Sequence, residues 1–254
     1  MTIEELREEV ATACRVLAAE GLVEGVLGHV SARVGADRML IRCRGRRERG
    51  LWFTTSEDVR LVDLDGRGEL DGGYGAPNEL PIHGELLRAR PRVGAVVHAH
   101  PPAVLLCGVA ELPLRPVFGA YNIPAMRMAL DGVPVYPRSV LIRRPELAAE
   151  MLAAMGDRPV CVLRGHGITV AGETVRQAVV RALNLNALAT VTVELARLGR
   201  VVPEIPAEDV AELPDLGSSF NDEAVWRYHV AKLAVPPWAL APGSRAAGWS
   251  APAR

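Results

Sequence analysis

Residues 93–100 have the sequence VGAVVHAH, a short run of small and β-branched apolar side chains that ends in two histidines. The run follows a helical pattern closed by Pro91, so it predicts a short buried strand. Side chains alternate between the two faces of a strand, and we therefore expect His98 and His100 to project on the same side. Two imidazoles placed in this way can reach one metal ion.

A third histidine follows another predicted strand. Residues 159–163, PVCVL, form a buried apolar run, and His166 comes shortly after it in the sequence RGHG. Gly165 and Gly167 flank this histidine and allow a tight turn and a close approach of the backbone. Three neutral imidazoles leave coordination positions open, which is typical of catalytic rather than structural zinc sites.

Glu79 precedes the histidine pair in the sequence APNELPIH, residues 76–83. Its place at the beginning of a predicted helix makes it a candidate acid/base or a fourth metal ligand. Ordinary interpretations stay open here: the histidines could be polar groups at the surface or at the edge of the core, and Glu79 could simply complement the helix dipole. His83, one helical turn later, could orient Glu79 or pack within the helix.

The rest of the chain alternates between helical and strand-like patterns. A helix over residues 2–20 begins with a capping box and is stopped by Gly21. Residues 30–64 form short runs, LWFTT at 51–55 among them, which predict strands in antiparallel pairs. Further helices are predicted at residues 79–91, 145–156, 174–199 and 221–234, and strands at 159–163 and 168–172. This alternation indicates an α/β fold in which helices cover a mixed sheet.

Composition restricts the class of partner. The chain has 254 residues, 49% of them hydrophobic, which suffices for one large domain or for one domain with a tail. Its 29 Lys and Arg nearly balance its 30 Asp and Glu, giving a formal net charge of -1. Nucleic acids and anionic membranes favour an excess of basic residues, so we expect neither as a partner and expect a small-molecule substrate instead.

The sequence predicts neither export nor insertion into a membrane. The beginning, MTIEELREEV, is acidic where a signal peptide would be basic and then apolar, and no stretch approaches the roughly 20 uninterrupted apolar residues of a membrane span. The cysteines lie far apart in the chain and are expected to be buried apolar residues rather than disulfides or zinc ligands. A cytoplasmic protein is therefore expected.

Three motifs together resemble one protein family. They are GHVSARV at residues 28–34, PNELPIHGELLRARPRVGAVVHAHPP at 77–102 and RGHGITVAGETVRQAV at 164–179. In this order and spacing they are similar to the class II aldolase/adducin family, which includes fuculose-phosphate aldolase and ribulose-phosphate epimerase. The similarity runs from the first helix to about Gly199. We expect a metal-dependent lyase domain over 1–202, an extension over 203–240 that packs on the domain or on a neighbouring subunit, and a disordered tail over 241–254.

The resemblance implies a metal, a fold and an assembly. In that family, three histidines that match His98, His100 and His166 hold one divalent ion per subunit. The ion is commonly zinc, and manganese, iron or cobalt are the alternatives. The family's acid/base glutamate matches Glu79. The family fold is a three-layer α/β/α domain with a mixed, mostly antiparallel central sheet, usually assembled as a homotetramer with sites between subunits.

The sequence departs from the sugar-phosphate aldolases at the positions that hold the phosphate. Those aldolases use an asparagine turn, a serine/glycine turn and two serines before the glutamate. Here the matching residues are His29, then Ser56 and Glu57, then Pro77 and Asn78. A carboxylate at Glu57 would repel a phosphate dianion, and Pro77 lacks the amide donor of such a cradle. The sequence therefore predicts that the phosphate pocket is lost.

Several polar residues are candidates for substrate contact. His29, Ser31 and Arg33 stand where an anion would bind, and a guanidinium pairs well with a carboxylate. Ser56 is a further candidate. Tyr121 falls near the place where family aldolases supply a tyrosine acid from the neighbouring subunit. Each has an ordinary alternative, such as a turn histidine, a solvated strand arginine or an interface tyrosine.

The implied chemistry is cleavage of a carbon–carbon bond. Such cleavage leaves an electron pair as an enolate or carbanion, which a chelated divalent ion stabilises. We favour decarboxylation of a hydroxylated aromatic carboxylic acid, because the family contains dihydroxyphthalate-type decarboxylases. The alternative is an aldolase acting on a hydroxy-carbonyl compound with or without phosphate.

Two other classes of function stay open. One is a non-catalytic, adducin-like assembly protein, against which the retention of Glu79 and the three histidines argues. The other is an iron-dependent oxygenase, because three imidazoles also suit iron(II).

Overall fold

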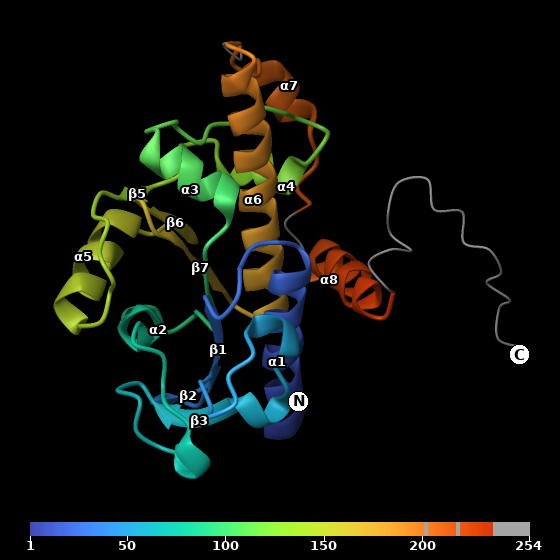
Figure 1. Cartoon of the computed structure of the whole chain (residues 1–254). Helices are drawn as coiled ribbons and strands as arrows, with labels where there is room; N and C mark the ends of the chain where they lie inside the picture. The colour runs from blue at the N-terminus through green and yellow to red at the C-terminus, as the bar shows by residue number, and fades with distance from the viewer. Residues whose placement is uncertain (201–202, 217–218, 236–254) are drawn as a thin grey trace, which may run out of the picture.

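A mixed sheet runs through the middle of the computed structural model, which describes residues 1–200, 203–216 and 219–235 (Figure 1). The strands are β1 (His29–Val34), β2 (Arg38–Arg42), β3 (Val59–Asp63), β4 (Ala95–Ala99), β5 (Val135–Tyr136), β6 (Val160–Leu163) and β7 (Gly167–Gly172). They lie in the order β3-β2-β1-β4-β7-β6-β5. Neighbouring strands are antiparallel, apart from the parallel pair β5 and β6. The predicted mixed, mostly antiparallel sheet is confirmed.

Helices cover both faces of this sheet (Figure 1). They are α1 (Ile3–Ala19), α2 (Leu80–Ala89), α3 (Pro102–Val109), α4 (Ile123–Met128), α5 (Pro145–Met155), α6 (Val175–Arg197), α7 (Ala207–Glu212) and α8 (Ser219–Leu233). One core cluster joins α1, α3 and α6 to sheet residues such as Val97 and Val170. The other joins α2 and α5 to Val96 and Ala171, which alternate with the first pair along β4 and β7. The predicted three-layer α/β/α architecture is therefore confirmed.

Helix α1 begins as its capping box predicts. The Thr2 hydroxyl accepts the Glu5 backbone N–H at 3.2 Å, and the Glu5 carboxylate accepts the Thr2 N–H at 2.7 Å. The helix ends before Gly21, whose φ of 71° lies in the left-handed region that glycine adopts freely. Its apolar side packs in the same core cluster as α6.

Helix α6 is the long helix that lies along one face of the sheet. It begins at the Thr174 cap and buries apolar residues against β4, β7 and α3. By length and composition alone it could cross a membrane, although Arg181 and Asn184 interrupt its apolar residues. Its buried packing on the sheet explains the apolar composition as that of a core helix.

One expectation about local structure is wrong. Residues 51–55 do not form a strand: Leu51–Phe53 is a single turn of 3-10 helix, which follows Gly50 at a φ of 88° and packs beside α1. Between β4 and α5 the chain also contains α3, α4 and β5, for which no sequence pattern was given above. Helix α3 is apolar on all sides, so the chain shows no amphipathic period there.

The described part of the expected extension over 203–240 includes α7 and α8. Helix α8 contacts α6 and α1, and its Trp226 is buried in the core cluster. Arg176 of α6 joins the three helices by pairing with Glu9 of α1 at 3.0 Å and with Glu223 of α8 at 2.5 Å.

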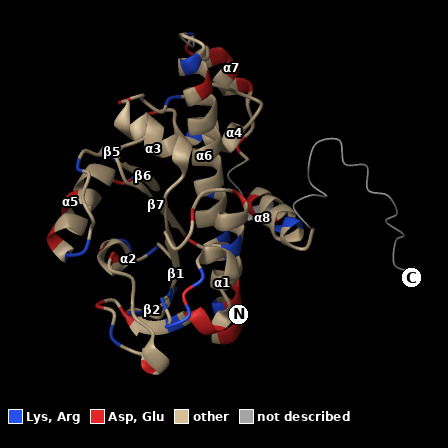
Figure 2. Ribbon diagram, in the orientation of Figure 1, with Lys and Arg blue, Asp and Glu red and all other residues tan. Residues whose placement is uncertain are grey.

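Basic and acidic segments are interspersed over the ribbon in Figure 2. The expected boundary at 202 and the expected tail, 241–254, lie outside the described residues and stay predictions.

Gly84 lies where α2 touches the end of the sheet. A Cβ atom there would come within 2.2 Å of the carbonyl oxygen of Leu64. Alanine favours a helix more than glycine does, yet we expect Gly84→Ala to lower the free energy of unfolding by about 1–3 kcal/mol through this clash. Urea denaturation measures the change. The control is Gly75→Ala, where a Cβ meets nothing within 4 Å, with an expected change below about 0.5 kcal/mol. A gain in stability for Gly84→Ala would contradict the tight contact.

Candidate metal centre

The candidate site lies at one end of the three central strands, on the face that α2 and α5 cover. In the sheet, His98 of β4 pairs with His29 of β1 on one side and with Thr169 of β7 on the other. Because Val96 belongs to the core beneath α2 and α5, the alternation of side chains along β4 puts His98 on that face as well.

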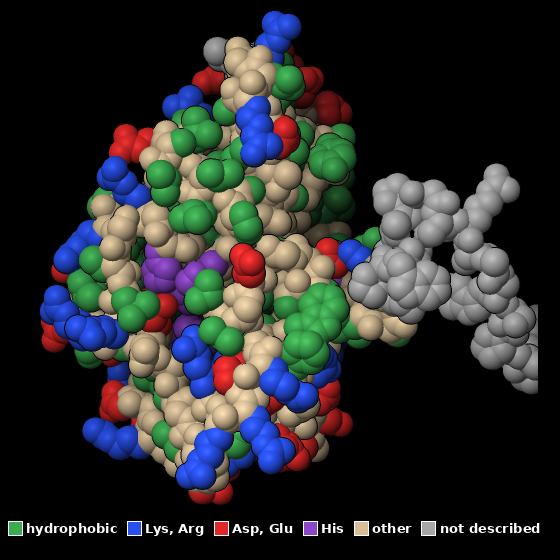
Figure 3. All heavy atoms as spheres, viewed as in Figure 1, with side chains coloured by type: hydrophobic (Ala, Val, Ile, Leu, Met, Phe, Trp, Pro, Cys, Tyr) green, Lys and Arg blue, Asp and Glu red, His purple; other side chains and the backbone are tan. Residues whose placement is uncertain are grey.

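Glu79, His98, His100 and His166 converge as the sequence analysis expected. One ligand atom from each lies within 4.8 Å of all the others. The Nε2 atoms of His98 and His100 are 2.9 Å apart. Glu79 Oε2 lies 3.2 Å from His98 Nε2 and 3.3 Å from His166 Nε2. Figure 3 shows the histidine side chains reaching the surface in one patch.

The hydrogen bonds around the cluster leave ring nitrogens available to a cation. His98 Nδ1 lies 2.9 Å from the carbonyl oxygen of Ile168, which can only accept, so Nδ1 carries the hydrogen and Nε2 presents its lone pair. Nδ1 of His166 is buried and has no hydrogen-bond partner among the described residues, and its buried Nε2 has only the 3.3 Å contact with Glu79 Oε2. Three imidazoles and one carboxylate are a donor set that suits a divalent ion such as zinc.

Two glycines hold His166 in place. Gly165 has a φ of 63°, which an L side chain rarely adopts. A Cβ atom on Gly167 would lie 2.3 Å from the carbonyl oxygen of Ala99. The predicted tight turn and close backbone approach are both confirmed, and together they bring His166 next to the end of β4.

Glu79 is held by a segment far along the chain that no sequence motif connects with the site. It immediately precedes α2, and its Oε1 accepts the backbone N–H of Ile142 at 2.9 Å. This contact fixes one carboxylate oxygen and leaves Oε2 beside the histidines. Nothing in the sequence marks Ile142, because a backbone amide carries no residue-specific signal.

A second row of polar groups lies next to the first. His83 Nε2 is 2.7 Å from His29 Nδ1, and His83 Nδ1 is 2.6 Å from the Ser31 hydroxyl. All three side chains are buried. His83 is therefore neither the partner of Glu79 nor a merely packed helix histidine: it bridges α2 to β1.

Two of the expected substrate contacts lie elsewhere. Arg33 donates to the carbonyl oxygens of Val93, Leu87 and Arg90, so it anchors the end of α2 instead of joining the cluster. Ser56 opens a 3-10 turn that packs beside α1, and no hydrogen bond links it to the cluster in the described part of the chain. Neither position supports direct contact with a ligand at the histidines.

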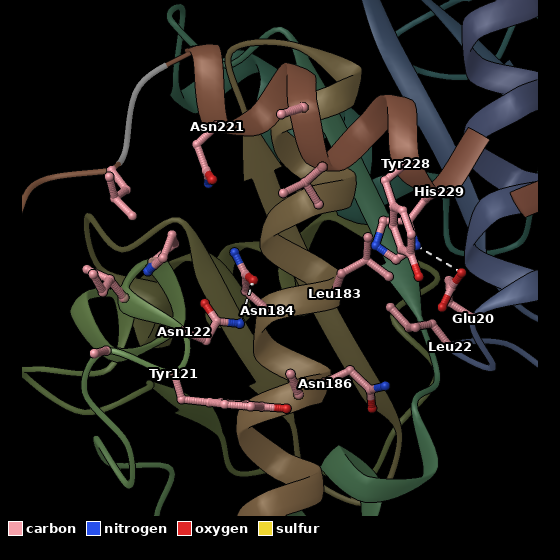
Figure 4. Close-up of a pocket in the computed structure, with 17 residues that line it drawn as sticks. Glu20, Leu22, Tyr121, Asn122, Leu183, Asn184, Asn186, Asn221, Tyr228 and His229 are labelled. Atoms are coloured by element: carbon pink, nitrogen blue, oxygen red, sulfur yellow. Dashed lines mark hydrogen bonds and ion pairs between the residues drawn. The ribbon is translucent and has the colours of Figure 1, made fainter. Parts of the chain in front are cut away.

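Tyr121 lines a separate groove of about 690 Å³ between the segment before α4, α6 and α8 (Figure 4). Its side chain is 81% exposed. Leu22 belongs to the wall of this groove and also accepts the backbone N–H of His100 at 2.9 Å. The groove is thus joined to the cluster through the backbone, but the structure does not bring Tyr121 to the histidines of its own chain.

Burial keeps most of these imidazoles neutral. Burial, with a smaller contribution from His98, lowers the pKa of His83 to about 3 and that of His100 to about 3. Burial, together with the nearby His83 and His98, holds the pKa of His29 well below its usual value. For Glu79, burial alone would raise the pKa, but the contacts with His166 and His98 outweigh it and lower the pKa. Neutral imidazoles beside a carboxylate are the protonation states that a metal site needs.

The metal-free protein should lose stability as the pH falls from 6.5 toward 3. Between its unfolded pKa near 6.5 and its folded value of about 3, His83 takes up a proton only in the unfolded state. As the pH falls through this window, each buried histidine with a lowered pKa reduces the free energy of unfolding by about 1.4 kcal/mol per pH unit. Urea denaturation at several pH values measures the slope. The His83→Phe variant should show a slope smaller by about one proton, and an equal slope would remove His83 from the explanation.

Comparison with known proteins places the chain among enzymes. It is 55% identical to a 3,4-dihydroxyphthalate decarboxylase of Arthrobacter keyseri over 90% of this chain and 94% of that protein. It is 49% identical to a protein of the same name in Rhodococcus jostii (strain RHA1), over 92% of this chain and 98% of that one. Decarboxylases are carbon–carbon lyases, so the predicted class of enzyme is confirmed.

The fold comparison agrees. An L-fuculose 1-phosphate aldolase from Glaciozyma antarctica PI12 superposes with a TM-score of 0.72 at 20% identity, over 91% of this chain and 90% of that one. The family model described as "Class II Aldolase and Adducin N-terminal domain" matches residues 8–193. With the fold, the cluster and these relatives in agreement, the chain belongs to the class II aldolase and adducin family.

Proposed function

We propose that this enzyme decarboxylates a dihydroxylated aromatic dicarboxylate of the 3,4-dihydroxyphthalate type, using one divalent ion, zinc in the first instance. The observation that carries the proposal is the convergence of Glu79 with three histidines in a chain that is 55% identical to such a decarboxylase over nearly its full length. The substrate is an inference from these relatives, and the histidine cluster supplies its chemical basis.

Aldol cleavage of a sugar phosphate is less well supported. The relatives named as aldolases of 5-methylthioribulose-1-phosphate share only 30% identity or less with this chain. The residues that face the phosphate in the family aldolases are replaced here, and Pro77 has no backbone N–H to offer. A planar aromatic acid carries no phosphate and therefore does not need these residues.

His98, His100 and His166 would hold the ion, and Glu79 stands within reach as a further ligand or as a proton carrier. A bound divalent ion supplies Lewis acidity to substrate oxygens and so stabilises the electron pair left by departing carbon dioxide. The hydrogen bond from His98 to Ile168 orients the ring for this task. Manganese, iron and cobalt accept the same donors and are the alternatives to zinc.

Glu79 is the group that would move the proton. As a carboxylate, it takes a proton from a substrate hydroxyl through Oε2, while Ile142 holds Oε1. The bond between the ring carbon and the leaving carboxylate then breaks, carbon dioxide departs, and the electron pair stays on the ring carbon. Glu79 returns its proton to that carbon, and the phenolate left behind regains a proton from water. The products are a dihydroxybenzoate and carbon dioxide.

The remaining candidate residues receive different roles. His29 lies beside His98 and is proposed to contact the substrate. Ser31 is fully buried against His83, so its proposed role is indirect. Tyr121 is proposed to serve the site of a neighbouring subunit, since its exposure leaves it free to do so. Arg33 and Ser56 receive no role in the reaction, because their contacts lie away from the cluster.

Assembly and location are part of the same proposal. We infer a homotetramer from the assembly that is usual in the family, and the exposed Tyr121 would be free to reach a neighbouring subunit in it. We also propose a cytoplasmic location, as expected of an enzyme whose relatives are named for a small aromatic acid.

The test is turnover by the metal-loaded protein. With zinc, manganese, iron or cobalt restored after chelation, 3,4-dihydroxyphthalate should yield one carbon dioxide and one dihydroxybenzoate per molecule, measured by mass spectrometry, with no oxygen consumed. His98→Ala should bind less than about a tenth of an ion per chain and should lose turnover, because an open ligand set holds metal weakly. Carbon dioxide release that needs oxygen would favour an oxygenase, and the absence of bound metal in the wild type would favour an assembly protein.

Glu79→Gln separates metal binding from proton transfer. Glutamine keeps the shape and an oxygen acceptor but cannot carry the proton. We expect the variant to retain the metal and to lose about 10²–10⁴-fold in kcat, the usual contribution of a positioned general acid–base. Metal content and kcat are measured on the same preparation. A variant with nearly wild-type kcat would remove the assigned role of Glu79.

A further inference from the structure

Three buried side chains form a hydrogen-bonded row beside the metal centre. The Ser31 hydroxyl oxygen lies 2.6 Å from Nδ1 of His83, and Nε2 of His83 lies 2.7 Å from Nδ1 of His29. Ser31 and His83 are fully buried, whereas His29 keeps 4% of its surface exposed. The His29 ring stands 4.9 Å, centroid to centroid, from that of His98.

The row can carry its hydrogens in only two directions, because a neutral imidazole has one N–H donor and one acceptor nitrogen. If His29 Nδ1 donated to His83, then His83 Nδ1 would donate to Ser31, and the Ser31 hydrogen would need another acceptor. The Ser31 side chain makes no other hydrogen bond to the described residues. In the opposite direction Ser31 donates to His83 and His83 donates to His29, so the one hydrogen without an acceptor in the row lies on His29, the only member that keeps exposed surface.

Satisfaction of buried polar groups therefore selects the second direction. In that arrangement His29 Nδ1 is an acceptor, so the hydrogen of the neutral ring resides on Nε2. Nδ1 is turned toward His83, which leaves Nε2 on the other side of the ring. His29 thus offers a hydrogen-bond donor that its neighbours have set in advance.

We propose that Ser31 and His83 are positioning residues that lock His29 as a neutral Nε2–H donor to a carboxylate oxygen of the substrate. The substrate class rests on the proposed function, whereas the direction of the row does not. A donor at this place attracts a carboxylate, and the other tautomer would present a lone pair that repels it. A neutral donor also adds no positive charge beside the three imidazoles that would hold a cation.

The direction of the row can be measured without any turnover. Long-range 1H–15N spectra of the full-length, zinc-loaded protein distinguish protonated from unprotonated ring nitrogens. We expect His29 and His83 to be Nε2–H tautomers in the wild type. In Ser31→Ala the end donor is lost, and both rings should populate a mixture of tautomers. An Nδ1–H tautomer of His29 in the wild type would overturn the proposal.

Binding of two small probes tests recognition of the carboxylate. Phthalate has two carboxylates and no hydroxyls, and catechol has two hydroxyls and no carboxylate. By calorimetry on the zinc-loaded protein, Ser31→Ala should raise the Kd of phthalate about five- to tenfold and change that of catechol less than twofold. Ser31→Thr keeps the hydroxyl and should restore phthalate binding. Thr169→Val, which removes another fully buried hydroxyl from the same face of the sheet, is the control and should change neither Kd.

The outcomes separate this inference from the proposed function. The wild type could show the expected tautomers, and Ser31→Ala could selectively weaken phthalate binding, while the wild type releases no carbon dioxide. That result would contradict the proposed decarboxylase and support the proposed direction of the row. Carbon dioxide release by the wild type, with binding of both probes unchanged or equally weakened in Ser31→Ala, would support the decarboxylase and contradict the proposed role of the row. Failure of the wild type to bind phthalate would overturn the assignment of a carboxylate to His29.

Discussion

The pairing of β4 between β1 and β7 is the constraint on which the rest of the structure depends. Its register places His29, His98 and Thr169 side by side, and it brings the turn that carries His166 to the end of β4. Because side chains alternate along a strand, a slip of one residue would turn His98 away from α2 and into the core beneath α6. The hydrophobic alternation that fixes the core on both faces of the sheet therefore fixes the metal centre as well.

Such a site costs stability. Several histidines and one glutamate share a mostly buried volume, where burial disfavours every charged form. The fold compensates with backbone groups that are rigidly placed: the carbonyl of Ile168 fixes His98, and the amide of Ile142 fixes Glu79. Fixed dipoles of this kind are also what catalysis needs, because they do not have to reorganise when charge develops.

The histidines of the site form two sets with different partners. His98, His100 and His166 present nitrogens to one point, whereas His29 and His83 are bonded to each other and to Ser31. The first set suits a cation and the second suits a hydrogen-bond acceptor. His29 on β1 and His98 on β4 lie on adjacent strands, so the proposed substrate contact and the candidate metal ligands stand side by side while each keeps its own partners.

The sequence by itself determined the class of fold, the helices with clear caps or amphipathic periods, and the identity of the four converging residues, because these follow from local patterns and from distinctive motifs. It did not determine the partners of those residues. Helical spacing suggests Glu79 as a partner of His83, and charge suggests a ligand for Arg33, but the packing of α2 against β1 gives both side chains other partners. The role of Ile142 was invisible for the same reason. Contacts made by backbone atoms, and contacts between segments far apart in the chain, exist only once the tertiary structure has brought those segments together.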